Sequence, residues 1–459
     1  MSESFTSSSW ARPRPNRLLR FCFSASIASL LLMTSCKDKS AEENPDPTSV
    51  SKATDTYSSE IATKWVDLEL KLIKTTPGYT PPVAARALGY TGLTLYETVV
   101  PGIKNNQSLV GQISGLTTLP KPDLTKEFNW GLAANAAMSS LVKEFFITTS
   151  DANKSTVDSL RKAFEASLKV NMSQEVIDRS IRFGADIATA IFEYSKTDGG
   201  HEGYNNNFPS SYVVPKGIGF WVPTGPQKIP LLPYWGKVRS FIAKNATTDP
   251  PAPIPFSYKT DSDFFKQAKA VFDAKKSLTT EQRNIALFWA DGSGTVTPPG
   301  HYINIATQVL RKESAKLDKV AETYAKMGMA LSDAFVACWR CKYRYNLMRP
   351  VTYIKETIDP SWTPLIATPP FPEYSSGHSS GSGAFSQIMT DLFGANYAFT
   401  DKTHEGTFAN RSYKSFFEAA DEAMNSRLYG GIHYPMGNQN GRDNGKKIGQ
   451  NVSALKFTK

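Results

Sequence analysis

Apolar residues recur at helical spacing along most of the chain. Ile61, Trp65, Leu68 and Leu72 fall at positions i, i+4, i+7 and i+11, which places them on one face of a helix. Two later segments repeat the pattern: Val157, Leu160, Phe164 and Leu168, then Ile177, Ile181, Gly184, Ala188 and Ile191. No stretch of the sequence alternates apolar and polar residues for long enough to predict a sheet. The pattern therefore predicts an all-α fold built as one or two helical bundles.

Several helix ends are also marked in the sequence. Ser173 is an N-cap candidate, and the run from Thr279 to Gln282 has the form of a capping box that opens a helix. A longer helix is predicted from about Lys319 to Tyr345. Residues 209–255 differ, because ten prolines fall there among apolar and aromatic side chains. We predict that this segment is a long ordered loop packed on the helices.

The first 56 residues have the pattern of an export signal followed by a tether. Four arginines precede the apolar run from Phe21 to Met33, which is too short to span a bilayer and is typical of a signal peptide over residues 1–35. The run ends in Met33-Thr-Ser-Cys36, which resembles a bacterial lipobox, and this implies a lipidated Cys36. Residues 36–56 are polar, as a tether would be. We expect an exported lipoprotein that is anchored to a membrane, in the periplasm or at the cell surface; the alternative is an ordinary signal peptide with a chance cysteine.

Composition narrows the class of protein. The chain has 459 residues, of which 40% are hydrophobic, so it is neither intrinsically disordered nor a polytopic membrane protein. Its net charge of +10 is dispersed, with no Lys/Arg run longer than two residues, so we expect no nucleic-acid partner. The basic charge is still compatible with a small anionic ligand. Cys338 and Cys341 form a single CxxC on the predicted long helix, where two core cysteines are favoured over a redox or zinc site.

Three short segments in the last third of the chain carry candidate chemistry. Lys342 and Arg349 are seven residues apart, so on a helix both would lie on one face, and an anion between them would relieve their repulsion. Ser376 and Gly377 precede apolar residues at helical spacing, and we place them at a helix N-terminus, where free N–H groups and the helix dipole favour an anion. Taken singly, these features also fit a solvated basic face and a plain N-cap.

The third segment begins at Ser426 and ends at His433. We expect the helix that starts near Ser415 to end at Gly430 and Gly431, with Arg427 in its last turn. With His378, the three segments supply three cations, a hydroxyl, a glycine amide and two imidazoles. That set suits a tetrahedral oxyanion, with one imidazole to bond the central atom and one for proton transfer.

The ordered pattern Lys-x6-Arg-Pro, Ser-Gly-His and Ser-Arg-x5-His resembles the tripartite motif of the type 2 phosphatidic acid phosphatase and vanadium haloperoxidase superfamily. Further likeness to the haloperoxidase branch is found over residues 332–339, 288–300, 231–236 and 81–86. The resemblance covers about residues 57–452. It implies two four-helix bundles side by side with the Pro-rich loop packed against them, which we place at residues 57–260 and 261–459, the second carrying the oxyanion site.

The resemblance also implies a role for each residue of the motif. His433 is expected to bind vanadium, and His378 to act as the acid–base residue. Asp291 is expected to accept a hydrogen bond from the other nitrogen of His433. The expected partners of the vanadate oxygens are Lys342, Arg349, Ser376, Gly377 and Arg427. Lys342 would also polarise bound peroxide, and Phe371 and Tyr374 are candidates for the halide pocket.

The implied activity is that of a vanadium-dependent haloperoxidase, which oxidises halide with hydrogen peroxide to hypohalous acid. We expect vanadate as the cofactor, in a site that phosphate could also occupy, and iodide or bromide as the halide, with iodide preferred. One alternative is an acid phosphatase that forms a phosphohistidine at His433. Against it, phosphatase relatives usually carry Asp four residues after the last His, where this chain has Gly437. A second alternative is a non-catalytic oxyanion-binding surface lipoprotein.

Overall fold

A computed structural model describes residues 50–459. The predicted signal peptide, Cys36 and most of the predicted tether lie outside the described residues. Within the described range the protein has thirteen α-helices and a two-stranded sheet, which confirms the all-α prediction. The two strands, β1 (Phe399–Asp401) and β2 (Arg411–Tyr413), pair antiparallel and are too short to show as an alternating pattern in the sequence.

The helices in the first half of the chain form one packed group. Their bounds are α1 (Glu60–Thr75), α2 (Pro81–Val99), α3 (Trp130–Phe145), α4 (Asp151–Leu168) and α5 (Gln174–Lys196). Helix α3 contacts α1, α2, α4 and α5. The apolar face predicted for α1 is buried, and Trp65 and Leu72 are fully inaccessible to solvent.

The helices of the second half surround the candidate site. Their bounds are α6 (Asp263–Lys276), α7 (Thr280–Phe288), α8 (Thr297–Lys312), α9 (Leu317–Tyr345), α10 (Pro350–Thr357), α11 (Gly377–Phe393), α12 (Phe416–Tyr429) and α13 (Pro435–Ser453). The capping box predicted at Thr279 and Gln282 is present at the start of α7. Ser376 and Ser415 cap α11 and α12, as expected.

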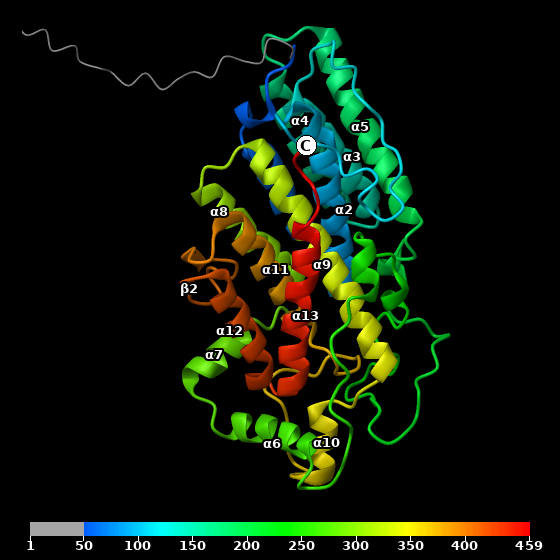
Figure 1. Ribbon diagram of the computed structural model, residues 1–459, viewed down its shortest axis with the longest axis vertical. Helices are drawn as coiled ribbons and strands as arrows, with labels where there is room; N and C mark the ends of the chain where they lie inside the picture. The colour runs from blue at the N-terminus through cyan, green and yellow to red at the C-terminus, as the bar shows by residue number, and fades with distance from the viewer. Residues whose placement is uncertain (1–49) are drawn as a thin grey trace, which may run out of the picture. The chain divides into compact units, whose positions relative to one another are not determined.

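Helix α9 belongs to both groups. It packs along α2 on one side and against α11 and α13 on the other (Figure 1). Its residues are buried over nearly the whole length, because both sides are covered. The larger of two hydrophobic clusters within residues 50–459 runs from α1 to α13 and does not break at the expected boundary near residue 260. A smaller cluster joins α6, α10 and the end of α9. Cys338 and Cys341 lie in α9 as buried free thiols, as predicted.

Glycines let α11 and α13 approach closely. A Cβ atom at Gly383 would lie 2.1 Å from the carbonyl oxygen of Arg442, and one at Gly445 would lie 2.1 Å from that of Ser380. Only glycine fits at such a separation. The close contact fixes the N-terminus of α11, which carries the Ser-Gly-His segment, against the N-terminal half of α13.

The Pro-rich loop packs on the helices, as predicted. Trp221, Leu231 and Trp235 are buried, and the loop contains only the short 3-10 helices η4 (Trp235–Lys237) and η5 (Ala243–Thr247). The tether predicted over residues 36–56 is too long at its C-terminal end. Residues 54–56 form the 3-10 helix η1, in which Thr54 is fully buried and donates a hydrogen bond to the carbonyl of Val99.

Candidate active site

The three motif segments converge at the N-terminus of α11. Lys342 is in the last turn of α9, Arg349 caps α10, and Arg427 is in the last turn of α12. His433 follows α12, in the turn before α13. The positive charges of Arg349, Lys342 and Arg427 all act on His433, so the cations gather around one imidazole as the sequence predicted.

Lys342 and Arg349 do not lie on one helix, contrary to the prediction from the sequence. Helix α9 ends at Tyr345, and Asn346 takes a left-handed conformation with φ of 44°. Arg349 therefore lies beyond the helix end, and the two cations do not share a helix face. They come together because the chain reverses between α9 and α10.

Lys342 holds the backbone that leads into α11. Its Nζ donates to the carbonyl oxygens of Pro372, Glu373 and Ser375, at 3.0, 2.9 and 2.5 Å. An ammonium group has three hydrogens, so a bond from Lys342 to an oxyanion needs the exchange of one of these bonds. Burial lowers the pKa of Lys342 to about 8.

Arg349 is partly free to bind a ligand. Its Nε donates to the carbonyl of Phe371 at 2.8 Å, and its Nη1 donates to that of Ile432 at 2.7 Å. Its Nη2 is buried and has no hydrogen-bond partner among residues 50–459. A buried guanidinium hydrogen without an acceptor is costly, and an anion in the site would remove that cost.

Glu373 accepts the hydrogen bond that orients His433. The Nδ1 of His433 lies 2.7 Å from Oε1 of Glu373, and its Nε2 lies 3.2 Å from Nη1 of Arg349. A carboxylate at Nδ1 fixes the tautomer with the proton on Nδ1, so the Nε2 lone pair accepts a hydrogen bond from Arg349, and a ligand at Nε2 would replace that bond. Burial lowers the pKa of His433 well below its ordinary value, so the ring is neutral at pH 7.

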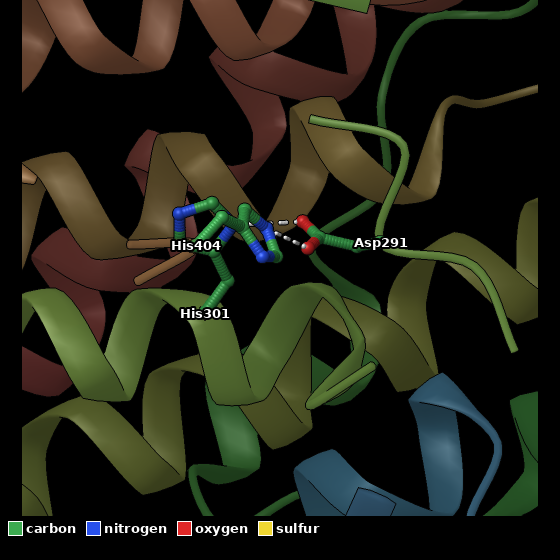
Figure 2. Close-up of side chains that lie close together, drawn as sticks. All are labelled: Asp291, His301 and His404. Atoms are coloured by element: carbon green, nitrogen blue, oxygen red, sulfur yellow. Dashed lines mark hydrogen bonds and ion pairs between the residues drawn. The ribbon is translucent and has the colours of Figure 1, made fainter. Parts of the chain in front are cut away.

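The prediction that Asp291 accepts this hydrogen bond is wrong. The Asp291 carboxylate contacts His301 and His404 instead: its Oδ2 is 2.9 Å from Nδ1 of His301 and its Oδ1 is 3.0 Å from Nε2 of His404 (Figure 2). Sequence reasoning missed Glu373 because it is 60 residues away from His433 along the chain. The signal that could have found it is Gly437, the position where a carboxylate was expected.

Glu373 occupies the space above Gly437. A Cβ atom at Gly437 would lie 2.3 Å from Oε1 of Glu373. The glycine in α13 therefore makes room for a carboxylate from the segment before α11. A carboxylate expected at position 437 in a phosphatase is thus replaced in space by one from another element.

The N-terminus of α11 supplies neutral donors. The Oγ of Ser376 accepts hydrogen bonds from the backbone N–H and the hydroxyl of Ser379, at 3.3 and 2.9 Å, and keeps its own hydrogen to donate. Gly377 is the first helical residue, so its N–H has no carbonyl partner within the helix. Both donors lie where the helix dipole favours an anion.

His378 lies one residue further into α11 and is poised as a base. Its Nε2 is buried and has no hydrogen-bond partner within the described part of the chain. Burial, helped by the charge of Arg427, lowers the pKa of His378 well below its ordinary value. The ring is therefore neutral at pH 7 and can accept a proton.

Arg427 is held by two helices. Its Nη2 donates to the carbonyl oxygens of Trp289 and Ala286, at 2.5 and 3.3 Å, and its Nε donates to the hydroxyl of Ser426 at 2.8 Å. These partners fix the guanidinium in a fully buried position. The end of α7 thus positions a cation of the site, a role that sequence reasoning had not assigned to it.

The two halide-pocket candidates differ in where they lie. The Phe371 ring is beside both cations, 5.0 Å from Nζ of Lys342 and 4.9 Å from Cζ of Arg349. Tyr374 is buried, and its hydroxyl bonds with the carbonyl of Pro251 and the side chain of Asn440. That hydroxyl is already committed and is not free to bind halide, so the place of Tyr374 in a halide pocket stays a prediction.

The donor set fits a multiply charged tetrahedral oxyanion. Lys342, Arg349 and Arg427 are fully buried cations, while burial raises the pKa of Glu373 to about 7, so Glu373 carries less than a full charge near neutrality. The site has an excess of buried positive charge, which requires an anion. The unpartnered Nη2 of Arg349 and the Nε2 of His433 are the atoms on this chain best placed to receive vanadate or phosphate.

Comparisons with known proteins give concordant results. Residues 322–458 match the family described as the VCPO second helical-bundle domain. The chain is 25% identical over 389 residues to the vanadium chloroperoxidase of Curvularia inaequalis, covering 71% of this chain and 64% of that protein. A solved bacterial vanadium-dependent iodoperoxidase is 34% identical, with a TM-score of 0.80, over 88% of this chain and 98% of the other. A bacterial vanadium-dependent chloroperoxidase shares the fold at 16% identity, with a TM-score of 0.64, over 83% of this chain and 93% of the other.

Proposed function

Because the chain belongs to the vanadium-dependent haloperoxidase family, we propose that it binds vanadate at His433 and oxidises halide with hydrogen peroxide to hypohalous acid. The observation that carries the proposal is the group around His433. Three buried cations surround a neutral imidazole whose Nδ1 is held by Glu373 and whose Nε2 faces the site. A plain surface lipoprotein would have no need to bury three cations at one point.

Vanadate, when bound, supplies a Lewis acid that activates hydrogen peroxide toward attack by halide. The chain's own residues do the rest. Arg349, Ser376 and Gly377 bind and orient the oxyanion, because each offers a donor without an acceptor among residues 50–459, and Arg427 adds a buried positive charge. His378 takes the proton that peroxide loses, since its imidazole is neutral and its Nε2 is free within the described residues. Lys342 keeps the 372–375 backbone in place and adds positive charge where negative charge develops.

We further propose iodide as the preferred halide, with weaker or absent activity on bromide and none on chloride. The relative at 34% identity is an iodoperoxidase, whereas the solved chloroperoxidase shares only 16% of its residues. Chemistry agrees, because iodide is the easiest halide to oxidise. Steady-state rates with iodide, bromide and chloride at equal concentration and mildly acidic pH test the order. Chloride turnover equal to that of iodide would overturn it.

A phosphatase reaction is a second candidate, and one contact favours it. The lack of a carboxylate at Gly437 had counted against a nucleophilic His433, but Glu373 supplies a carboxylate to its Nδ1 at 2.7 Å. His433 could therefore attack phosphate, and His378 would act as the general acid only at acidic pH, where its imidazole is protonated. Hydrolysis of a phosphomonoester by the vanadate-free protein tests this. Trapping of a phosphohistidine that is lost in His433→Ala would support it.

We propose that the mature protein is an exported lipoprotein anchored to a membrane through Cys36. The support is the Arg-rich start and the lipobox-like ending of the apolar run. Among residues 50–459, none of the helices combines the length and apolar character needed to cross a membrane. Mass spectrometry of the protein from a bacterial host should find a diacylglyceryl group on an N-terminal Cys36. An unmodified N-terminus elsewhere would refute the proposal.

A further inference from the structure

We propose that Asp291, His301 and His404 form a binding site for one divalent transition metal ion of the zinc type, separate from the oxyanion site. The ligand atoms of these three residues all lie within 4.8 Å of one another. They come from three different parts of the chain: the loop after α7, the first turns of α8 and the turn between β1 and β2. The tertiary fold therefore assembles the group, and no local turn brings it about.

The carboxylate of Asp291 faces both rings. Its Oδ2 is 2.9 Å from Nδ1 of His301 and its Oδ1 is 3.0 Å from Nε2 of His404, so each carboxylate oxygen faces one imidazole nitrogen (Figure 2). Without a metal, hydrogens on the rings fill these contacts. Around a tetrahedral ion, ligand atoms lie about 3.3 Å apart. Small rotations of the side chains would bring the three atoms to that spacing, and His404 can rotate most easily because it is partly exposed.

A second carboxylate, that of Asp401, contacts the other ring nitrogen of His301. The Nε2 of His301 lies 2.7 Å from Oδ2 of Asp401, whose other oxygen accepts hydrogen bonds from the N–H and hydroxyl of Thr403. Histidines that bind metal almost always donate their second N–H to a carboxylate, carbonyl or water. Asp401 would hold the hydrogen on Nε2 and leave Nδ1 of His301 as the ligand atom. Asp401 is not one of the three proposed ligands, and its contact with His301 matches the arrangement usual around metal-binding histidines.

Aromatic side chains hold the rings of His301 and His404 in place, and a metal ion could reach the site only from the side of His404. Trp289 stacks on His301 with ring centroids 4.5 Å apart, and Phe288 packs edge-on against both His301 and His404. The side chains of Asp291 and His301 are fully buried, whereas that of His404 is 13% exposed, so an ion would enter past His404. Two imidazoles and one carboxylate suit zinc or a similar ion, whereas calcium and magnesium prefer oxygen ligands alone.

The site would act on the oxyanion site through the backbone. Trp289 lies two residues before Asp291, and Tyr302 directly follows His301. The carbonyl of Trp289 accepts a hydrogen bond from Arg427 at 2.5 Å, and the hydroxyl of Tyr302 donates to the carbonyl of His378 at 3.0 Å. An ion that ties the loop after α7 to α8 would therefore stiffen the support of one cation and of the proton acceptor. Its role is structural, and vanadate plays no part in it.

The test is zinc binding by the full mature chain in phosphate-free and vanadate-free buffer. After treatment with a chelator and removal of it, titration calorimetry should find one high-affinity zinc site per chain. Cobalt in its place should give the visible absorption of a low-coordinate complex. Zinc at about 100-fold excess over its Kd should raise the melting temperature by roughly 3 °C. His404→Ala should weaken binding by more than about 100-fold, and Asp401→Asn by about 10–100-fold.

His201→Ala is the matched control, because His201 is an exposed histidine in the first half of the chain. It should leave zinc affinity unchanged. His404 is partly exposed, so its loss should leave the far-UV circular dichroism intact. Equal zinc affinity in His404→Ala and His201→Ala would overturn the proposal. So would the absence of stoichiometric binding in the wild type, or binding that His433→Ala abolishes and His404→Ala does not.

Discussion

At the residue scale, the decisive contact is the one between Glu373 and His433. A buried carboxylate 2.7 Å from Nδ1 decides which nitrogen of the ring is free for a ligand. The site residues predicted from the motif all come together here, because the motif names side chains that must touch one ligand. Glu373 was not predicted, since nothing in local spacing links it to a histidine 60 residues away. Asp291 was assigned to the wrong histidine for the same reason.

We expect Glu373→Gln to weaken vanadate binding by about 10–100-fold, the usual cost of losing a partner that orients a metal ligand. The amide can still accept a hydrogen bond but no longer stabilises the ring electrostatically. Asp291→Asn, the matched control, should change the affinity much less, because Asp291 contacts His301 and His404. Equilibrium dialysis with vanadate gives both constants. A larger loss in Asp291→Asn than in Glu373→Gln would contradict the assignment.

His378→Ala should retain vanadate but lose halide oxidation. Its neutral ring is the proposed proton acceptor, and a positioned base typically contributes 10²–10⁴-fold to a rate. Turnover of the vanadium-loaded variant, with vanadium content measured on the same sample, checks this. Turnover within a few-fold of the wild type at full loading would remove His378 from the mechanism.

At the element scale, helix existence was predictable and helix junctions were not. The apolar face of α1, the capping box of α7 and the N-cap of α11 follow from local spacing and local hydrogen bonds. The turn between α9 and α10 does not, because Asn346 takes a left-handed conformation that depends on packing. Lys342 and Arg349 were expected on one helix face, yet they meet across this turn.

Gly437→Ala should weaken vanadate binding even though alanine favours a helix over glycine by about 1 kcal/mol. The new Cβ would lie 2.3 Å from Oε1 of Glu373 and would push the carboxylate away from His433. Gln439→Ala, at an exposed position of the same helix, is the control. Vanadate affinity and melting temperature of both variants test this. Equal affinity in Gly437→Ala and the wild type would show that Glu373 does not set the orientation of His433.

Helix α1 carries a fully buried carboxyl group, that of Glu69, whose protonation should affect stability. Burial raises the pKa of Glu69 to about 8, although Thr91 donates a hydrogen bond to it. In the unfolded chain its pKa is near 4.3. The folded state therefore holds an extra proton between these values, so this contribution to stability is full below about pH 4 and is lost as pH rises through 8.

We accordingly expect the stability of Glu69→Gln relative to the wild type to be greater at pH 9 than at pH 5. The amide keeps the shape of the protonated acid and cannot ionise. Melting temperatures of both proteins at the two pH values give the comparison. A difference between the proteins that does not change with pH would show that Glu69 is not held protonated.

At the scale of the whole molecule, the order of the three motif segments was more informative than any one of them. Each segment alone fits a solvated face or a simple cap, whereas the ordered set implies a fold that brings all three together. The helical groups share α9 and the larger hydrophobic cluster, which contains residues from both halves of the described chain. Sequence periodicity could not show this sharing, because it depends on which faces pack on which.

The most direct test of the central claim is peroxide-dependent iodide oxidation by the purified protein before and after loading with orthovanadate, with His433→Ala assayed beside it. We expect activity to rise with vanadate, to saturate at one vanadium per chain, and to be absent from His433→Ala. Iodide oxidation that does not depend on vanadate, or that is equal in His433→Ala, would contradict the account.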